Sequence, residues 1–358
     1  MTQQIKITKS DKSRLSEVDF NNIPFGKIFT DYMFEADYID GEWKNAEIKP
    51  LKEMSVHPGN MAWHYGQAIF EGMKATRDAE GNALLFRPEM HAKRFNRSAE
   101  RLCMPAVPEE FFLNAVSTLV DLEKAWIPPQ IGSAMYIRPF MISFDHTIGV
   151  KASDTYKFIV FVLPVGPYYS QPVKLRAYPE YVRAVKGGVG EAKAAGNYAA
   201  SMLPAAQARK EGFDQVMWLD GLHHKYIQEV GTMNIFFVIG DEIITPNLDG
   251  AILKGITRDS VITLLRHHDY NVVERQISID EVVEASKKGT LKEVFGTGTA
   301  AVVATVSTIK YLDTIVTLDT ENTPVSTFVK DTINGMRNKT VVDNFGWIVP
   351  AHETVAVS

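Results

Sequence analysis

The sequence contains very little cysteine: Cys103 is the only one among 358 residues. A single cysteine allows no disulfide within the chain, which excludes the small secreted scaffolds that depend on disulfides and fits a reducing compartment. Cys103 lies near the end of the amphipathic segment "SAERLCMPA", so we expect it to be a small core residue rather than a nucleophile.

Long apolar runs and an excess of positive charge are also missing. No stretch approaches the about 20 apolar residues that a membrane helix requires, and the N-terminal "MTQQIKITKSDKSRLSEVDF" lacks the apolar core of a secretory signal peptide. The net charge is -5, with lysines and arginines scattered along the chain, which argues against nucleic acid or an anionic membrane as a partner. We therefore expect a soluble cytoplasmic protein.

What is present is a chain of ordinary globular composition, 45% hydrophobic and 23% charged, that is long for a single core. The segment "PYYSQPVKLRAYPEYVRAVKGGVG" interrupts the strand and helix patterns with prolines and tyrosines. We therefore predict a small N-terminal α/β domain over residues 1–170, an interdomain loop over 171–182, and a larger C-terminal α/β domain over 183–358. The expected fold class is α+β or mixed α/β.

Turn and helix signals are distributed along both predicted domains. Asp40-Gly41 and Gly81-Asn82 are typical of the tips of β-hairpins. Thr257 is placed to cap one helix, and Ser278 with Glu281 forms a capping box at the start of another. The expected helices lie within 88–104, 108–126, 197–212 with a kink near Pro204, 256–269 and 278–289, and the expected strands within 134–144, 156–166, 214–221, 225–246 and 271–279.

One lysine has unusual neighbours. In "GGVGEAKAAGNYAAS", residues 187–201, Lys193 is surrounded by glycine and alanine, so a flat molecule could approach its backbone closely. A partly desolvated lysine is driven toward the neutral amine, which attacks aldehydes to form a Schiff base. The same composition also suits a flexible loop with an incidental exposed lysine, and the spacing alone favours that simpler interpretation.

Three other segments offer groups that could serve the same site. Glu229 in "KYIQEVGTMNIFF" is a single acid in an apolar strand. Burial there demands a cationic partner, such as a protonated heterocycle, unless the residue lies on an exposed edge. The helix start at Gly255-Ile256 and the Gly-Thr pairs of "EVFGTGTAAVV" present backbone amides that suit anions, although ordinary helix caps and tight turns have the same patterns.

In this order, the segments of the chain resemble those of the branched-chain aminotransferases. These are pyridoxal-phosphate enzymes of fold type IV, a group shared with D-amino-acid aminotransferase and aminodeoxychorismate lyase. The resemblance is carried by "FGKIFTDYM", "WHYGQAIFEGMKA", "LFRPEMHAKRFNRSAERLCMP", "YIRP", "LPVGPYY", "GGVGEAKAAGNY", "QEVGTMNIFF", "ILKGITRDS" and "GTGTAAVV". It covers almost the whole chain and implies the two-domain architecture of the D-amino-acid aminotransferase-like enzymes.

The resemblance also implies a role for each residue that matches the cofactor site of the family. Lys193 would hold pyridoxal 5'-phosphate as a Schiff base and move the proton between the substrate Cα and the cofactor. Glu229 would keep the pyridine nitrogen protonated so that the ring accepts electrons, and Tyr198 would bind the phenolic oxygen of the ring. The residues that would bind the phosphate are Arg94, Ile256, Thr257 and Thr299.

For the substrate, the resemblance places the α-carboxylate against the Thr299–Ala300 turn and Tyr65, and the distal carboxylate of glutamate near Arg138. The aromatic residues that would line the side-chain pocket, each of which could equally be core packing, are Phe29, Phe70, Tyr136 and Tyr168. Ala301 and Ala304 replace the Cys-x-x-Cys pair of some animal members, so we expect no thiol-based redox control there.

The implied activity is ping-pong transamination. L-leucine, L-isoleucine or L-valine gives up its amino group and leaves as a 2-oxo acid, and 2-oxoglutarate takes the group and leaves as L-glutamate. We also expect a homodimer, as in the family, and no metal. Two alternatives stay open: D-amino-acid transamination or a lyase reaction with the same cofactor, and a non-catalytic protein that keeps the fold. The "YIRP" segment argues against the first, and the suitable residue type at every cofactor position argues against the second.

Overall fold

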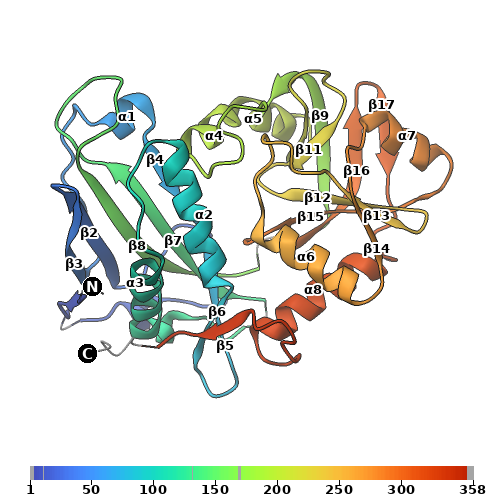
Figure 1. Cartoon of the computed structure of the whole chain (residues 1–358). Helices are drawn as coiled ribbons and strands as arrows, with labels where there is room; N and C mark the ends of the chain where they lie inside the picture. The colour runs from blue at the N-terminus through green and yellow to red at the C-terminus, as the bar shows by residue number, and fades with distance from the viewer. Residues whose placement is uncertain (1–3, 11, 131, 168–170, 353–358) are drawn as a thin grey trace. The chain divides into compact units, whose positions relative to one another are not determined.

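The computed structural model describes residues 4–10, 12–130, 132–167 and 171–352. These residues form two units, each a mixed β-sheet with α-helices packed against it (Figure 1). The predicted mixed α/β fold class is therefore confirmed. None of the helices within the described ranges is both long enough and apolar enough to span a membrane.

The two units divide the chain differently from the predicted domains. The first unit holds Met1–Tyr168, Ala192–Gly196 and Asn334–Ser358, and the second holds Tyr169–Glu191 and Asn197–Ile333. The segment with the alanine-flanked lysine and the C-terminal residues therefore group with the N-terminal part of the chain. The predicted C-terminal domain over 183–358 included both of these segments, because it followed sequence order alone.

The predicted interdomain loop over 171–182 is largely a strand, β9 (Val173–Val182), in the sheet of the second unit. Its first residues alternate between buried and accessible side chains, as a strand that packs on one face does. Pro179, which favoured a loop, lies in a stretch that the register shift against β10 (Gln215–Leu219) leaves out of the ladder. Its missing N–H therefore costs no ladder hydrogen bond.

The strands of the first sheet are β1 (Lys6–Ile7), β2 (Tyr32–Ile39), β3 (Glu42–Pro50), β4 (Ala68–Phe70), β5 (Met73–Arg77), β6 (Ala83–Phe86), β7 (Ala134–Ser143), β8 (Tyr156–Val165) and β18 (Ile348–Pro350). Their order is β1-β3-β2-β8-β7-β5-β6-β18, with β4 paired to β7. Both predicted hairpins are present. Asp40 and Gly41, with φ of 55° and 81°, join β2 to β3, and Gly81-Asn82 lies between β5 and β6. Left-handed φ at both central positions is what a two-residue hairpin turn of type I′ requires.

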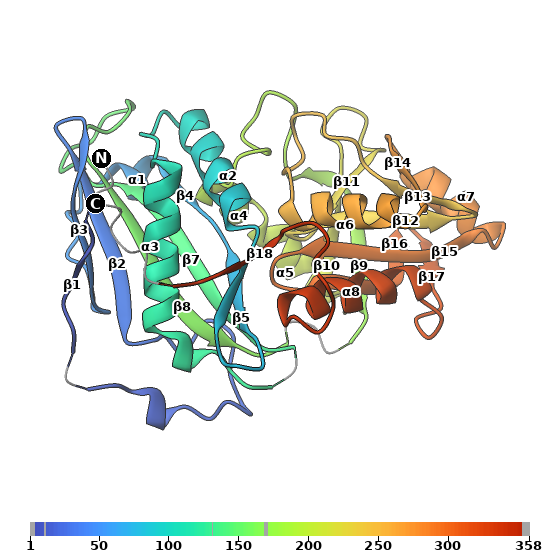
Figure 2. The ribbon, with the colours of Figure 1, turned by 60° about the horizontal axis from the view of Figure 1, so that its bottom comes forward.

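The helices of the first unit are α1 (Met61–Tyr65), α2 (Pro88–Arg101) and α3 (Glu109–Leu122). Both α2 and α3 cover the same face of the first sheet (Figure 2). Phe95 of α2, Phe112 of α3 and Phe158 of β8 are fully buried and pack ring to ring, with centroids 5.4, 5.5 and 5.6 Å apart. Each such ring contributes about 1.5–3 kcal/mol through burial, and together they fix α2, which carries part of the candidate site.

Cys103 follows α2 in a left-handed conformation, with φ 54°, and is exposed. The prediction that it is a small core residue is wrong. The chain turns after the helix ends, so its neighbour Met104 is buried while the Cys103 side chain faces solvent.

The remaining strands of the second sheet are β11 (Ile227–Val230), β12 (Asn234–Ile239), β13 (Glu242–Thr245), β14 (Asn271–Glu274), β15 (Leu291–Gly298), β16 (Val302–Tyr311) and β17 (Thr314–Thr317). Their order is β11-β10-β9-β16-β15-β12-β13-β14, with β17 paired to β16. The other helices are α4 (Ala195–Ala200), α5 (Met202–Lys210), α6 (Ile256–His267), α7 (Ile279–Lys287) and α8 (Pro324–Arg337). The predicted kink near Pro204 is confirmed: the helix is broken between α4 and α5, and Pro204 lies in the first turn of α5, where its missing N–H is tolerated.

The helix starts of the second unit agree only in part with the predictions. Ser278 caps α7 by accepting a hydrogen bond from the Glu281 amide at 3.1 Å, as predicted. Thr257 does not cap α6, because the helix begins directly after Gly255, which is the N-cap residue. A Cβ on Gly255 would lie 1.9 Å from Asn234 Oδ1, so this close approach requires glycine. Thr257 instead lies inside the first turn.

Candidate active site

The backbone at Lys193 is held in the first unit by contacts with β4 and α2. The Lys193 amide donates to Ser98 Oγ at 2.9 Å, and its carbonyl accepts from the Phe70 amide at 3.1 Å. Ala194 forms a β-bridge with Ile69, and the alanines on both sides of the lysine are buried. Small neighbours allow the segment to lie against β4, so the lysine side chain extends from a fixed point. The alternative of an incidental exposed lysine is wrong, because the Lys193 side chain is half-buried and its backbone is hydrogen-bonded on both sides.

Phe70 brings three predicted site residues together within the first unit. Its ring centroid lies 4.8 Å from Lys193 Nζ and 4.6 Å from the guanidinium carbon of Arg138. Arg138 Nη2 donates a hydrogen bond to the Tyr136 hydroxyl at 3.0 Å. Because an aromatic face attracts cations, Phe70 stabilises the positions of both the amine and the guanidinium. An amine, an apolar ring and a polar pair therefore lie side by side.

Phe29 belongs to the same side of the first sheet. Its ring packs edge-on against Phe161, with centroids 5.6 Å apart. Both rings pack against a buried cluster that contains Ala134, Tyr136, Leu163 and Val165. The Phe29 ring therefore packs against the buried cluster that contains Tyr136, and its place in the wall of a side-chain pocket stays a prediction.

Two residues next to these were missed in the sequence. Gly72 has no room for a side chain because the Tyr136 hydroxyl occupies that space. Lys74 lies opposite Tyr136 in the β5–β7 ladder, is only 9% exposed, and has its pKa lowered to about 7 by burial and by the charge of Arg337. A glycine and a lysine in the strand region "IFEGMKA", between apolar residues and the acidic Glu71, were the available signal.

Arg94, the predicted phosphate ligand, is oriented by a buried carboxylate that sequence reasoning also missed. Arg94 Nε and Nη2 donate to Glu71 Oε1 and Oε2 at 2.7 and 2.8 Å, and His91 Nδ1 lies 2.7 Å from Glu71 Oε2. Burial would raise the pKa of Glu71, but the charge and hydrogen bonds of Arg94 outweigh it and hold the pKa far below its usual range. Burial lowers the pKa of His91 against the pull of Glu71, and the charges of Arg94 and Lys193 add to the lowering. Glu71 is therefore an ionised anchor for the guanidinium.

In the second unit, Glu229 lies on β11 and is 4% exposed. Its Oε1 accepts a hydrogen bond from the Leu253 amide at 2.7 Å, and its Oε2 lies 3.2 Å from Arg183 Nε. Arg183 also donates to the carbonyl of Ala251. The alternative of an exposed edge glutamate is wrong, and the cationic partner that burial demands is present as Arg183. Sequence reasoning missed it because Arg183 is distant from Glu229 along the chain.

The helix start and the turn that are predicted to bind anions are both formed in the second unit. Ile256 and Thr257 are buried in the first turn of α6, where the first amides and the helix dipole favour an anion. Thr299 and Ala300 lie in the turn between β15 and β16. Val302, just after this turn, has φ 63°, a conformation that β-branched residues rarely adopt. Backbone strain of this kind tends to occur at functional sites.

The other predicted residues lie in less informative places. Tyr198 is half-buried in α4, and its carbonyl accepts a hydrogen bond from Ser201 Oγ at 2.8 Å. Tyr65 is the last residue of α1 and is 45% exposed. Tyr168 lies outside the described residues. Within the described ranges, no three His, Cys, Asp or Glu side chains gather as a metal site would require.

Residues 68–309, more than half of the chain, match the family model described as amino-transferase class IV. The chain belongs to the class IV aminotransferases. This class IV chain is 46% identical to branched-chain-amino-acid aminotransferase 2 of Bacillus subtilis (strain 168), over 97% of each sequence. It is 48% identical to branched-chain-amino-acid transaminase 1 of the same organism, over 92% of this chain and 95% of the relative.

Solved structures place the class IV chain in fold type IV. The crystal structure of the T.th. branched-chain amino acid aminotransferase complexed with N-(5'-phosphopyridoxyl)-L-glutamate superposes with a TM-score of 0.71 at 26% sequence identity. The similarity covers 88% of this chain and 98% of that one. The predicted fold type IV architecture is therefore confirmed.

Proposed function

We propose that this chain is a branched-chain amino-acid aminotransferase. It transfers the amino group of L-leucine, L-isoleucine or L-valine to 2-oxoglutarate and releases the branched-chain 2-oxo acid and L-glutamate in a ping-pong reaction. The observation that carries the proposal is the group of Lys193, Phe70, Arg138 and Tyr136. In it, the amino group that would bond to the cofactor lies beside an apolar ring and a hydrogen-bonded tyrosine–arginine pair. The relatives at 46% and 48% identity support the substrate class.

Pyridoxal 5'-phosphate is the cofactor that the residues of this chain fit. An aldehyde needs an amine, a phosphate needs oriented donors, and a pyridine nitrogen needs a buried carboxylate. The residues that would hold it are Lys193, Arg94, Tyr198, Glu229, Ile256, Thr257 and Thr299. When bound, the cofactor supplies an aldehyde that captures the amino group and a ring that withdraws electrons from the substrate Cα. The phosphopyridoxyl group held by the T.th. enzyme supports this assignment.

Each protein group would then have one task. Lys193 Nζ would act as the general base that takes the proton from the substrate Cα. The hydrogen bonds of the Lys193 backbone with Ser98 and Phe70 fix the point from which this side chain extends. Arg94 would bind the phosphate in the orientation that Glu71 imposes. The Glu229 carboxylate would hold a proton on the ring nitrogen.

One pocket must accept both an alkyl chain and a carboxylate, because the two half-reactions use the same site. Leucine would contact the Phe29 and Phe70 rings, and the distal carboxylate of glutamate would contact Arg138 and the Tyr136 hydroxyl, which already form a pair. The remaining residues proposed for binding the α-carboxylate and closing the pocket are Tyr65, Tyr168, Thr299 and Ala300.

We also propose a cytoplasmic homodimer. The short helix α1 carries Trp63 and Tyr65, which are 63% and 45% exposed, and exposed large aromatic side chains favour a surface that a partner covers. Gel filtration with light scattering on the cofactor-loaded protein should give twice the chain mass. A monomer at all concentrations would contradict the dimer.

The test of the activity is a panel of amino donors with 2-oxoglutarate as acceptor, read beside the visible spectrum. The proposal predicts a yellow protein that uses L-leucine, L-isoleucine and L-valine. Preference for D-alanine would favour the D-amino-acid enzyme, and lyase products without glutamate would favour a lyase. A colourless protein that does not take up the cofactor would favour a non-catalytic role.

A further inference from the structure

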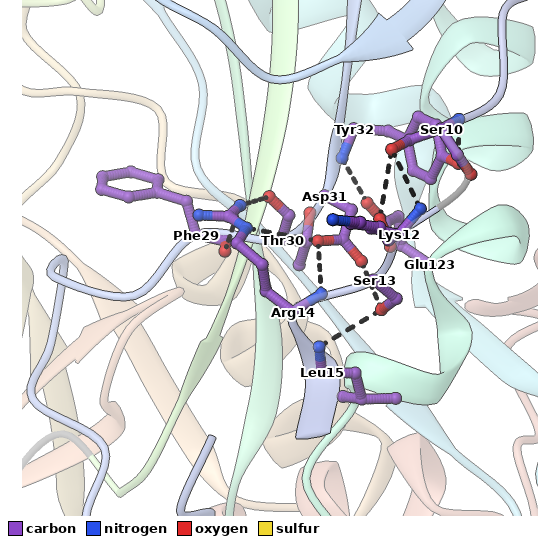
Figure 3. A network of polar contacts seen from close by, with 10 residues as sticks. All are labelled: Ser10, Lys12, Ser13, Arg14, Leu15, Phe29, Thr30, Asp31, Tyr32 and Glu123. Carbon is purple, nitrogen blue, oxygen red and sulfur yellow. Dashed lines mark hydrogen bonds and ion pairs between the residues drawn. The ribbon is translucent and has the colours of Figure 1, made fainter. Parts of the chain in front are cut away.

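The N-terminal arm, residues 12–15, lies against the start of β2 in the first unit (Figure 3). Arg14 makes most of the connections. Its Nη2 donates to the carbonyl oxygens of Phe29 and Thr30 at 3.2 and 2.6 Å, and its Nε and backbone amide donate to Asp31 Oδ1 at 3.3 and 3.0 Å. One arginine therefore binds two successive carbonyls and the carboxylate that follows them.

Asp31 is the buried anchor for this arrangement. Its side chain is 6% exposed, whereas that of Arg14 is 53% exposed. Ser13 Oγ donates to Asp31 Oδ2 at 2.6 Å, so donors from the arm reach both carboxylate oxygens. Burial would raise the pKa of Asp31, but the hydrogen bonds from Ser13 and Arg14 outweigh it and hold the pKa below its usual value. Asp31 therefore stays charged at neutral pH and keeps the guanidinium directed at the two carbonyls.

Phe29 and Thr30, whose carbonyls Arg14 binds, are also in contact with β8. The Thr30 amide donates to the Val162 carbonyl at 3.2 Å, and the Phe29 ring packs edge-on against Phe161, with the centroids 5.6 Å apart. The Phe29 ring also packs against the buried cluster of Tyr136. The position of this ring is therefore set by β8 on one side of the chain and by Arg14 on the other.

We propose that Arg14 is a positioning residue for substrate selection: by holding the carbonyls of Phe29 and Thr30, it fixes the Phe29 ring as a wall of the side-chain pocket. This inference rests on the proposed function, in which Phe29 lines that pocket. The planar guanidinium binds the carbonyls and the Asp31 carboxylate at once, which the single ammonium of a lysine does not do. When the Arg14 guanidinium and its hydrogen bonds are removed, the Phe29 ring has more freedom. The pocket then distinguishes less well between substrate side chains of different size.

The test is the ratio of kcat/KM for L-leucine to that for L-2-aminobutyrate, measured on cofactor-loaded wild-type, Arg14→Gln and Arg14→Lys proteins. The side chains of leucine and 2-aminobutyrate differ by two methylene units, and a shaped apolar pocket discriminates by about 10–200-fold for each such unit. We expect Arg14→Gln and Arg14→Lys to lower the leucine preference by about tenfold, mainly through a higher KM for leucine, with kcat changed by less than about twofold. Lys12→Gln removes a neighbouring exposed charge of the arm and should keep the wild-type ratio.

Two further measurements separate positioning from a general effect on folding. In a Phe29→Leu background, Arg14→Gln should change the leucine preference by less than about twofold, because the residue through which it acts is already altered. Amide hydrogen exchange in the segment around Thr30 should be faster in Arg14→Gln than in wild type, without any substrate. A partly unfolded variant loses activity with both donors equally, so the ratio does not respond to it.

The outcomes are distinct. An unchanged leucine preference in Arg14→Gln and Arg14→Lys, or an equal effect of Arg14→Gln with and without Phe29→Leu, overturns the inference and leaves the proposed function intact. A wild-type protein that uses no branched-chain donor contradicts the proposed function itself.

Discussion

A Cβ atom placed on Gly72 would lie 2.2 Å from the hydroxyl oxygen of Tyr136. That hydroxyl accepts the hydrogen bond of Arg138 at 3.0 Å, and the Arg138 guanidinium lies over Phe70. The absence of a side chain at position 72 therefore sets the place of the tyrosine–arginine pair that we propose for recognition of the distal carboxylate. No van der Waals adjustment of a few tenths of an ångström relieves a contact this short.

The first prediction is that Gly72→Ala impairs the glutamate half-reaction. The methyl group should displace the Tyr136 hydroxyl and break its bond with Arg138, so kcat/KM for L-glutamate should fall about tenfold or more, and more than for L-leucine. Gly149→Ala is the matched control, because a Cβ there meets nothing within 4 Å. Wild-type constants for glutamate in Gly72→Ala would show that the Tyr136–Arg138 pair does not recognise the distal carboxylate.

The second prediction concerns the buried cluster of Glu71, His91 and Arg94. Glu71→Gln leaves the guanidinium buried without its counter-charge, so the free energy of unfolding should fall by about 3–5 kcal/mol. The protein should also need more pyridoxal 5'-phosphate for half-saturation, since Arg94 loses its orientation. Glu47→Gln, which removes the partly exposed ion pair with Lys6, should cost about 1 kcal/mol or less. Equal losses in the two variants, measured by urea denaturation, would contradict the role of Glu71.

The third prediction is a pH dependence of stability from Glu123. Burial raises the pKa of Glu123 from 4.5 to about 7, against the hydrogen bond from the Tyr32 amide, and the nearby Asp31 charge raises it further. Because the folded-state pKa is above the unfolded value, the folded protein binds more protons between these two values. The stability from this group is therefore complete below pH 4.5 and is lost as the pH rises to about 7.

Glu123→Gln should abolish that part of the pH dependence, because the amide does not titrate. The difference in free energy of unfolding between variant and wild type should change in favour of the variant by up to about 3 kcal/mol between about pH 5 and about pH 8. Urea denaturation at both pH values measures it. Parallel pH profiles for the two proteins would show that Glu123 does not titrate as described.

Turns and helix caps, which depend on residues close together in the chain, are the features of this fold that the sequence predicts well. The Asp40-Gly41 turn and the Ser278 cap depend on residues a few positions apart, so their signals survive in any context. The small neighbours of Lys193 predict that another group can approach its backbone closely, and in the structure Ala194 lies close enough to Ile69 to form a β-bridge. Two local signals conflict in β9: Pro179 favours a loop, and the alternation of buried and accessible residues favours a strand. The segment forms a strand, because Pro179 lies outside the paired residues.

Pairs that are distant in sequence could not be predicted in this way. Glu229 demands a cationic partner, but nothing local identifies Arg183, because only the fold brings the two together. Gly72 and Tyr136 are a second example, since the need for glycine arises from a ring on another strand. The fate of Cys103 depends on how the chain turns after α2, which the amphipathic pattern of that helix does not contain.

The most direct test of the central claim is to identify the lysine that bonds to the cofactor. The protein loaded with pyridoxal 5'-phosphate is reduced with borohydride and digested, and the modified peptide is identified by mass spectrometry. Lys74 is an internal competitor, because burial and Arg337 lower its pKa to about 7. We expect the phosphopyridoxyl group on Lys193 alone; a label on Lys74, or no label on Lys193, would contradict the proposed role of Lys193.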